Sequence, residues 1–153
     1  MTSMQRCARS VDSGEPAFSL TIDRTPDGLL RIGPFVDRVT ASLGLGQRAE
    51  YALRICLEEA VANLVMHGHP APGDAPDMVA LRLSTSANRL SATIEDHCIP
   101  FDPRDTPAPT RPANLAEVKI GGLGIHLMRQ YAAAMDYHRV GAANRLTMTI
   151  ERG

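Results

Sequence analysis

The sequence predicts a single-domain α+β fold, because segments with strand periodicity and segments with helix periodicity share its 153 residues. Two alternating segments joined by Ser-Ala-Asn, and a second such pair near the C-terminus, predict β-hairpins. Between Gln47 and Met66 the apolar residues are distributed nearly all round a helix, which predicts a largely buried helix. A chain of this length buries roughly two thirds of its unfolded surface, so it needs no disulfide or metal to fold.

Each expected element follows from a local pattern. Alternation predicts strands and hairpins, and a spacing of three and four residues predicts helices, with Gly33-Pro34 delaying the start of the first helix. The expected strands are 18–22, 78–84, 89–95, 137–141 and 146–151, and the last two are joined by a turn at 142–144. The expected helices lie within 26–44, 47–66 and 125–135. Residues 1–15 are interpreted as a flexible tail before a domain of residues 16–153, in which 97–122 is a long irregular stretch.

Composition excludes several classes of protein. Three scattered cysteines, Cys7, Cys56 and Cys98, favour free thiols in a reducing compartment, so we expect a cytoplasmic location. We expect no membrane partner, since no apolar run approaches the roughly 18 residues that span a bilayer. A formal charge of −1, the absence of a dense basic cluster and only 4% aromatic residues argue against nucleic-acid binding.

Glu59 and Asn63 form a polar stripe on the predicted buried helix. Their i,i+4 spacing places both side chains on one face, where they can point at one ligand. An amide oxygen is a hard neutral ligand suited to Mg²⁺, and a carboxylate one turn away can activate a hydroxyl. The pair can equally satisfy neighbouring backbone groups or face solvent, and for the pair alone that structural interpretation is favoured.

Two further signals follow in a fixed order. Asp96 stands at the end of a predicted strand, where it can accept a hydrogen bond from an amine or simply form a turn. The glycine cluster 121–124 opens a predicted helix, where backbone N–H groups can bind phosphate, although a short glycine cluster is more commonly a hinge. Together with the Glu59 and Asn63 stripe, these signals supply the three parts of one Mg-ATP site.

The sequence motifs in these segments resemble those of the GHKL ATPase superfamily. The resemblance rests on Glu-Ala-Val-Ala-Asn-Leu-Val-Met-His-Gly at 59–68, on Asp96 with the Pro-Phe-Asp-Pro ending at 100–103, and on Gly-Gly-Leu-Gly-Ile-His-Leu-Met at 121–128. Within that superfamily the chain is similar to the anti-sigma factor serine kinases of bacterial partner-switching systems. The closing hairpin at 137–147 is also similar, so the resemblance covers nearly everything after residue 16.

The resemblance implies a role for each matching residue. Asn63 is expected to coordinate Mg²⁺, Glu59 to be the general base, and Asp96 to hydrogen-bond the adenine amino group. Further contacts to ATP are expected from Cys98, Phe101, Lys119, Gly121, Gly122, Leu123 and Gly124, with the loop 104–119 closing as a lid.

The resemblance also implies a fold, a reaction and partners. The expected fold is a two-layer sandwich of the Bergerat type, with helices on one face of a mixed, mostly antiparallel sheet. The expected reaction transfers the γ-phosphoryl group of ATP to a serine of an anti-anti-sigma (STAS-type) protein, in a chain that also binds a sigma factor. A homodimer is suggested by the family alone.

Cys98 departs from the family pattern, in which glycine occupies this position because the nucleotide base packs close to the backbone. Its side chain either narrows the adenine slot, with backbone strain if φ is positive, or packs at the pocket wall as a small apolar group. This departure motivates a second hypothesis, a non-catalytic or weakly nucleotide-binding partner module on the same fold.

Overall fold

Five strands form one sheet in the computed structural model, which describes residues 17–73, 77–107 and 123–153. The strands are β1 (Phe18–Asp23), β2 (Met78–Thr85), β3 (Arg89–Asp96), β4 (Ala134–Val140) and β5 (Ala143–Glu151), in the spatial order β1-β2-β3-β5-β4. All four strand pairings are antiparallel. The two central strands alternate between buried and more exposed residues, as one covered face requires.

Four α-helices accompany the sheet: α1 (Pro26–Leu29), α2 (Ile32–Leu43), α3 (Gln47–His67) and α4 (Leu123–Tyr131). Thr25 caps α1 by accepting from the Gly28 N–H at 3.1 Å. Helix α2 ends at Gly44, whose left-handed conformation (φ 61°) suits glycine. A short 3₁₀ helix, η1 (Pro103–Asp105), lies within the part of the irregular stretch that the structure describes.

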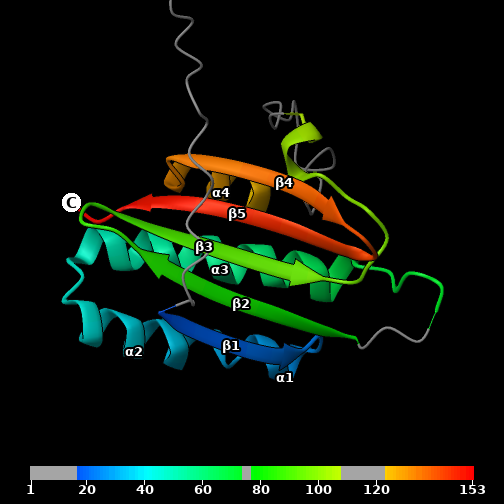
Figure 1. Ribbon diagram of the computed structural model, residues 1–153, viewed down its shortest axis with the longest axis horizontal. Coiled ribbons are helices and arrows are strands. Elements are labelled where there is room, and N and C mark those ends of the chain that lie inside the picture. Colours follow the sequence, from blue (N-terminus) through cyan, green and yellow to red (C-terminus); the bar gives the residue numbers. More distant parts are fainter. Residues whose placement is uncertain (1–16, 74–76, 108–122) are drawn as a thin grey trace, which may run out of the picture.

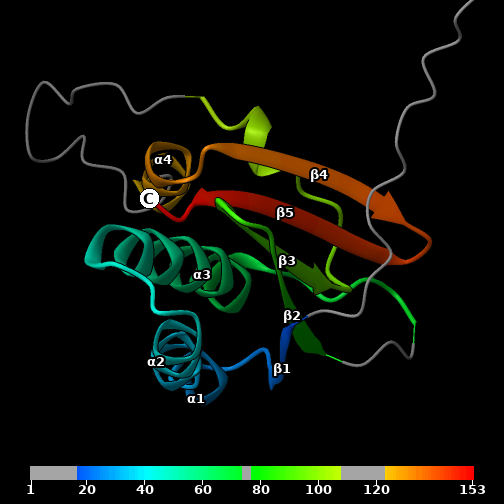
Figure 2. The same ribbon diagram turned by 60° about the vertical axis from the view of Figure 1, so that its left-hand side comes forward.

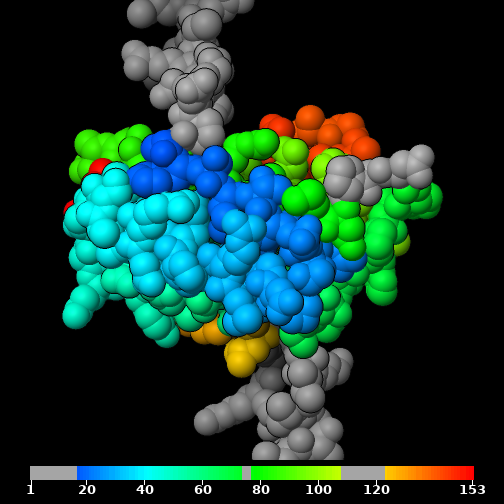
Figure 3. Space-filling model, turned by 90° about the horizontal axis from the view of Figure 1, so that it is seen from below, coloured from blue at the N-terminus to red at the C-terminus, as the bar shows by residue number. Residues whose placement is uncertain are grey.

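The helices lie together on one face of the sheet (Figures 1 and 2). Helix α3 runs along the middle of that face, with α2 on one side and α4 on the other, and α1 and α2 form much of the outer surface in Figure 3. The core between the layers consists of aliphatic side chains, and Phe35 is the one buried phenylalanine of the described residues. This arrangement confirms the predicted α+β class and its two-layer sandwich.

The structure corrects several element boundaries. The single helix expected within 26–44 is two helices, α1 and α2, and Pro34 lies in the first turn of α2, where a missing N–H costs nothing. The helix expected at 125–135 ends at Tyr131, because Met135 pairs with Met148 in the sheet. The expected turn at 142–144 is also wrong: the chain reverses earlier, with Gly141 at φ 60°, and Asn144 is part of β5.

In the described residues no helix is long and apolar enough to cross a membrane. The predicted tail, residues 1–15, lies outside the described residues, as do Lys119, Gly121 and Gly122.

Candidate functional site

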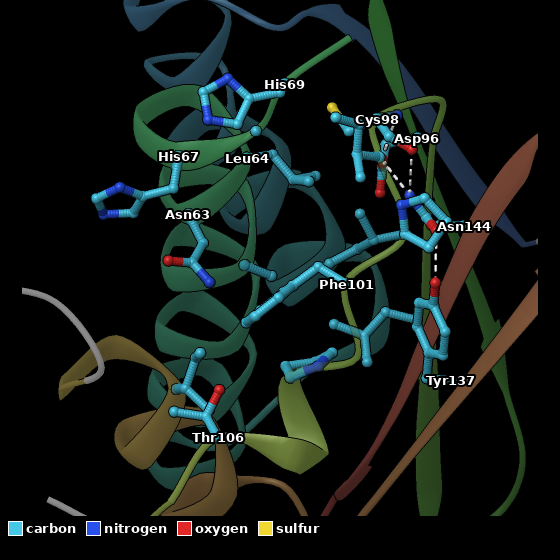
Figure 4. A pocket seen from close by; sticks show the side chains of 18 of the residues that line it. Asn63, Leu64, His67, His69, Asp96, Cys98, Phe101, Thr106, Tyr137 and Asn144 are labelled. Atoms are coloured by element: carbon cyan, nitrogen blue, oxygen red, sulfur yellow. Dashed lines mark hydrogen bonds between the residues drawn. The ribbon is translucent and has the colours of Figure 1, made fainter. Parts of the chain in front are cut away.

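A cavity of about 530 Å³ opens between α3, the end of β3 and the segment that follows β3. Asn63, His67 and His69 lie on its helix side, and Asp96, Asn144 and Tyr137 lie opposite (Figure 4). Most of its remaining lining is apolar: Ala60, Leu64, Ile94, Ile99, Pro100, Phe101, Pro103, Ile125, Met128 and Leu146. A largely apolar cleft with a few convergent polar groups is typical of a site for a small organic ligand.

Asp96 is one of two buried polar residues of the described chain, with 5% of its surface exposed. Its Oδ1 atom accepts from the Cys98 backbone N–H at 2.8 Å and from Asn144 Nδ2 at 2.9 Å. Within the described chain, no hydrogen bond is formed by its second oxygen, Oδ2. A buried carboxylate with an unused acceptor in an apolar cavity is suited to bind an amine.

Asn63 lies on α3, on the opposite side of the cavity, and is half-buried. Helical spacing places it one turn after Glu59 and one turn before His67, which also lines the cavity. Its side-chain amide makes no hydrogen bond to the other described residues, so its oxygen is available to a ligand. The two ends of the cavity therefore offer different chemistry, a carboxylate at one end and a neutral amide at the other.

Cys98 packs into the wall of the cavity, with 3% of its surface exposed. Its sulfur lies beside Gly68: a Cβ built on that glycine would stand 3.0 Å from Cys98 Sγ. No non-glycine residue in the described segments has a positive φ, so Cys98 carries no left-handed strain. Burial, helped by the nearby charge of Asp96, raises the pKa of the Cys98 thiol to about 11, which keeps it neutral.

The loop after α3 is fixed against the segment after β3. Ile99 donates its N–H to the His69 carbonyl at 2.8 Å, and Ala71 donates to the His97 carbonyl at 3.2 Å. Arg24, which follows β1, donates from Nη1 to the carbonyls of Leu64 (2.9 Å) and Gly68 (3.1 Å). These bonds hold the end of α3 and the rear wall of the cavity in place.

Glu59 does not line this cavity. It borders a separate hollow of about 370 Å³, formed with Leu29, Leu30, Gly33, Glu58 and Ala62. The half-buried Glu59 carboxylate abuts Gly124, at the start of α4, so closely that any side chain at Gly124 would collide with it. The structure thus brings Glu59 next to the beginning of α4. Glu59 is not part of the lining of the cavity that contains Asp96 and Asn63.

The remaining predicted site residues divide into two groups. Phe101 lines the cavity with 55% of its surface exposed, whereas Leu123 is 60% exposed and lies outside it. Lys119, Gly121 and Gly122 are not among the described residues, so their predicted contacts to ATP remain predictions.

Three residues of this region escaped the sequence analysis. Asn144 and Tyr137 line the cavity and bond to each other, and Arg24 supports its rear wall. Asn144 is 4% exposed and lies in β5, which begins three residues before the predicted strand 146–151, so the sequence analysis left it outside that strand. Arg24 gives no local signal, because its partners Leu64 and Gly68 are 40 and 44 residues away.

The polar and apolar groups that line the cavity are suited to bind ATP. Asp96 Oδ2 is a free acceptor for the amine of a base, and the apolar lining suits a planar ring. Within the described segments no cluster of three or more His, Cys, Asp or Glu side chains could hold a metal ion. The Asn63 amide oxygen is compatible with Mg²⁺, which commonly takes only one or two protein ligands beside phosphates and water.

Comparison with known proteins agrees with this geometry. The family model described as a histidine kinase-like ATPase domain matches residues 22–150. The chain is 32% identical over 106 residues to the serine/threonine-protein kinase BtrW of Bordetella bronchiseptica, and the match covers 67% of this chain and 70% of that protein.

Two solved structures match the chain, and the first of them is similar in fold. The structure of the RsbU and RsbW domains of Rv1364c from Mycobacterium tuberculosis superposes with a TM-score of 0.57 at 15% identity. That match covers 88% of this chain and only 32% of the other, so this chain spans about a third of its length. The histidine kinase domain of a blue-light activated kinase from Erythrobacter litoralis EL346 gives a TM-score of 0.47 at 18% identity, covering 81% of this chain and 60% of that one.

A match over residues 22–150, together with a relative of this similarity, confirms the resemblance to the serine kinase branch and implies that the domain uses ATP. The chain belongs to the family of histidine kinase-like ATPase domains.

Proposed function

We propose that this chain is a protein-serine kinase and anti-sigma factor that transfers the γ-phosphoryl group of ATP to a serine of an anti-anti-sigma (STAS-type) protein. The observation that carries the proposal is the cavity, with Asp96 Oδ2 at one end and the Asn63 amide at the other, neither of which bonds to another residue that the structure describes. The relationship to a serine/threonine-protein kinase supports the choice of reaction.

The proposed roles follow from these positions. Asp96 Oδ2 accepts from the amino group of adenine, and the apolar lining holds the ring. Asn63 contributes one oxygen ligand to a Mg²⁺ ion, which when bound neutralises phosphate charge. Glu59 accepts the proton of the acceptor serine as the serine oxygen bonds to the γ-phosphorus and the bond from that phosphorus to the leaving ADP oxygen breaks.

The position of Glu59 defines the direction from which the acceptor serine approaches. Its carboxylate borders the hollow between α1 and α3, not the cavity that holds Asp96. Because Glu59 lies one helical turn before Asn63 on α3, an acceptor side chain that enters this hollow from a separate protein surface approaches the base beside the metal end of the cavity. In this arrangement the nucleotide and the partner protein occupy different openings.

A second candidate function is a partner-binding module without catalysis. The observation that favours it is the same separation of Glu59 from the main cavity, together with Cys98 in the place of the expected glycine. In that case the chain binds its sigma factor or anti-anti-sigma partner but does not transfer phosphate.

Transfer of labelled phosphate from Mg-ATP to a purified anti-anti-sigma protein distinguishes the two. The kinase proposal predicts serine labelling that Glu59→Gln reduces by about 10²- to 10⁴-fold, the contribution typical of a general base. Glu58→Gln is the matched control, because Glu58 is an equally half-buried carboxylate in the adjacent position of α3 and borders the same hollow. Absence of labelling at saturating ATP, with partner binding intact, would support the binding module and refute the kinase.

A further inference from the structure

Three adjacent strands bring polar residues to the same end of the sheet. In the register, Asp96 of β3 is opposite Asn144 of β5, and Asn144 is opposite Arg139 of β4. Tyr137 lies two residues before Arg139 and therefore on the same face of β4. Four polar side chains thus converge beside the nucleotide cavity, one from β3 and three from the distant β4–β5 hairpin.

All four hydrogen-bonding positions of the Asn144 side-chain amide are used within this group and the adjoining backbone. Its Nδ2 donates to Asp96 Oδ1 at 2.9 Å and to the Cys98 carbonyl at 3.0 Å. Its Oδ1 accepts from the Tyr137 hydroxyl at 2.5 Å and from Arg139 Nη1 at 3.0 Å. Because an arginine can only donate, the atom that it contacts must be the amide oxygen, and this fixes which way the amide faces.

The orientation of the Asn144 amide determines how the carboxylate of Asp96 is held. Both of its donors in the described chain, the Cys98 N–H and Asn144 Nδ2, bind Oδ1, so the carboxylate is held by one oxygen. An asparagine whose four hydrogen-bonding positions are used has none left for the ligand. Asp96 Oδ2 is then the acceptor that this group presents to the cavity.

We propose that Asn144 and Tyr137 are positioning residues for recognition of the purine amino group. Tyr137 and Arg139 orient the Asn144 amide, and this amide holds Asp96 so that Oδ2 is left for the base. Figure 4 shows the bonds of Asn144 to Tyr137 and Asp96. The inference rests on the proposed ATP site and assigns it a determinant of base specificity. The hydroxyl of Tyr137 stays protonated, since burial raises its pKa, and it therefore remains a donor to Asn144.

The test compares ATP with inosine triphosphate, which carries a carbonyl oxygen where adenine carries the amino group. A hydrogen bond to a charged acceptor is worth about 1.5–3 kcal/mol, so the wild-type protein is expected to prefer ATP by about 10- to 100-fold. Asn144→Leu removes the amide while keeping the same branched arrangement of heavy atoms, and is expected to reduce this preference to about threefold or less. Tyr137→Phe, the milder variant, is expected to reduce it by about two- to tenfold, the value of one neutral hydrogen bond.

Thr147→Val is the matched control. Thr147 lies three residues after Asn144 in β5, and its hydroxyl pairs with Thr93 Oγ1 at 3.2 Å, away from the cavity lining. Its loss is expected to leave the ratio of the two affinities unchanged.

The outcomes separate the inference from the function on which it rests. If Asn144 and Tyr137 had a purely structural role, their variants would bind both nucleotides more weakly by the same factor. An unchanged ratio of the two affinities in both variants would therefore overturn the inference and leave the proposed ATP site intact. If Asn144→Leu does not fold by circular dichroism, the ratio for Tyr137→Phe decides. Failure of the wild-type protein to bind either nucleotide would refute the proposed site and the inference with it.

Discussion

Replacing Arg24 by methionine is expected to destabilise the protein by about 3 kcal/mol. The Arg24 side chain is 10% exposed, and its guanidinium donates to the carbonyls of Leu64 and Gly68 at the end of α3. Hydrogen bonds from a charged donor contribute about 1.5–3 kcal/mol each, but Leu64 O keeps a second donor, the Gly68 N–H at 3.0 Å. The ion pair with Asp77, a residue 54% exposed, adds at most about 1 kcal/mol.

Methionine preserves the packing of the aliphatic stem, so the loss reports the guanidinium itself. For a domain of this size, about 3 kcal/mol corresponds to a decrease in Tm of about 6–12 °C. Urea unfolding measures the same loss as a lower midpoint at constant slope. Arg31→Met is the control, because exposed Arg31 makes one bond, to the Thr21 carbonyl at 3.1 Å, and should cost less than about 1 kcal/mol. An equal loss of stability in the two variants would refute the inference that the Arg24 guanidinium stabilises the end of α3.

Three other outcomes follow from the geometry. Gly124→Ala is expected to lower phosphoryl transfer at least tenfold without unfolding the protein, because its new Cβ must displace the Glu59 carboxylate; unchanged transfer would contradict this contact. Site-resolved alkylation of Cys98 at pH 8 is expected to proceed at about a thousandth of the rate of a full thiolate, since burial raises its pKa to about 11, and fast labelling would contradict its burial. Glu95→Gln is expected to destabilise the protein fully above about pH 4.5 and progressively less at lower pH. Burial tends to raise the Glu95 pKa, but Arg145 and Arg82 lower it overall, so the stabilisation is lost as the pH falls through that lowered pKa; a loss that does not depend on pH would argue against the ion pairs.

Local patterns were sufficient to predict the central part of the fold. Helix α3 and the β2–β3 hairpin match their predicted ranges within one or two residues, because apolar periodicity and turn residues are local properties. The end of α4 was wrong for the opposite reason. Met135 fits a helical spacing as well as a strand, and only its pairing with Met148 decides between them.

The candidate site shows the same division. Asn63 and Asp96 could be found from the sequence because each belongs to a recognisable sequence motif, and the structure brings both to one cavity. Asn144 and Tyr137 could not, since their value lies in the register of β4, β5 and β3, which no local pattern specifies. Glu59 lies one helical turn from Asn63 as expected, but its carboxylate abuts Gly124 and it borders a separate hollow, because the packing of α4 against α3 is not a local property.

Binding of Mg-ATP to wild-type protein and to Asp96→Asn, measured by calorimetry, tests the central claim most directly. Two donors hold the acceptor atom at the Oδ1 position, the Cys98 N–H and Asn144 Nδ2, so the amide of the variant must turn its NH₂ group toward the ligand. The account predicts saturable binding by the wild type, with about 2.7 kcal/mol of added stability at 100 times the Kd, and affinity at least tenfold weaker in the variant. No binding by the wild type, or equal binding by both proteins, would contradict it.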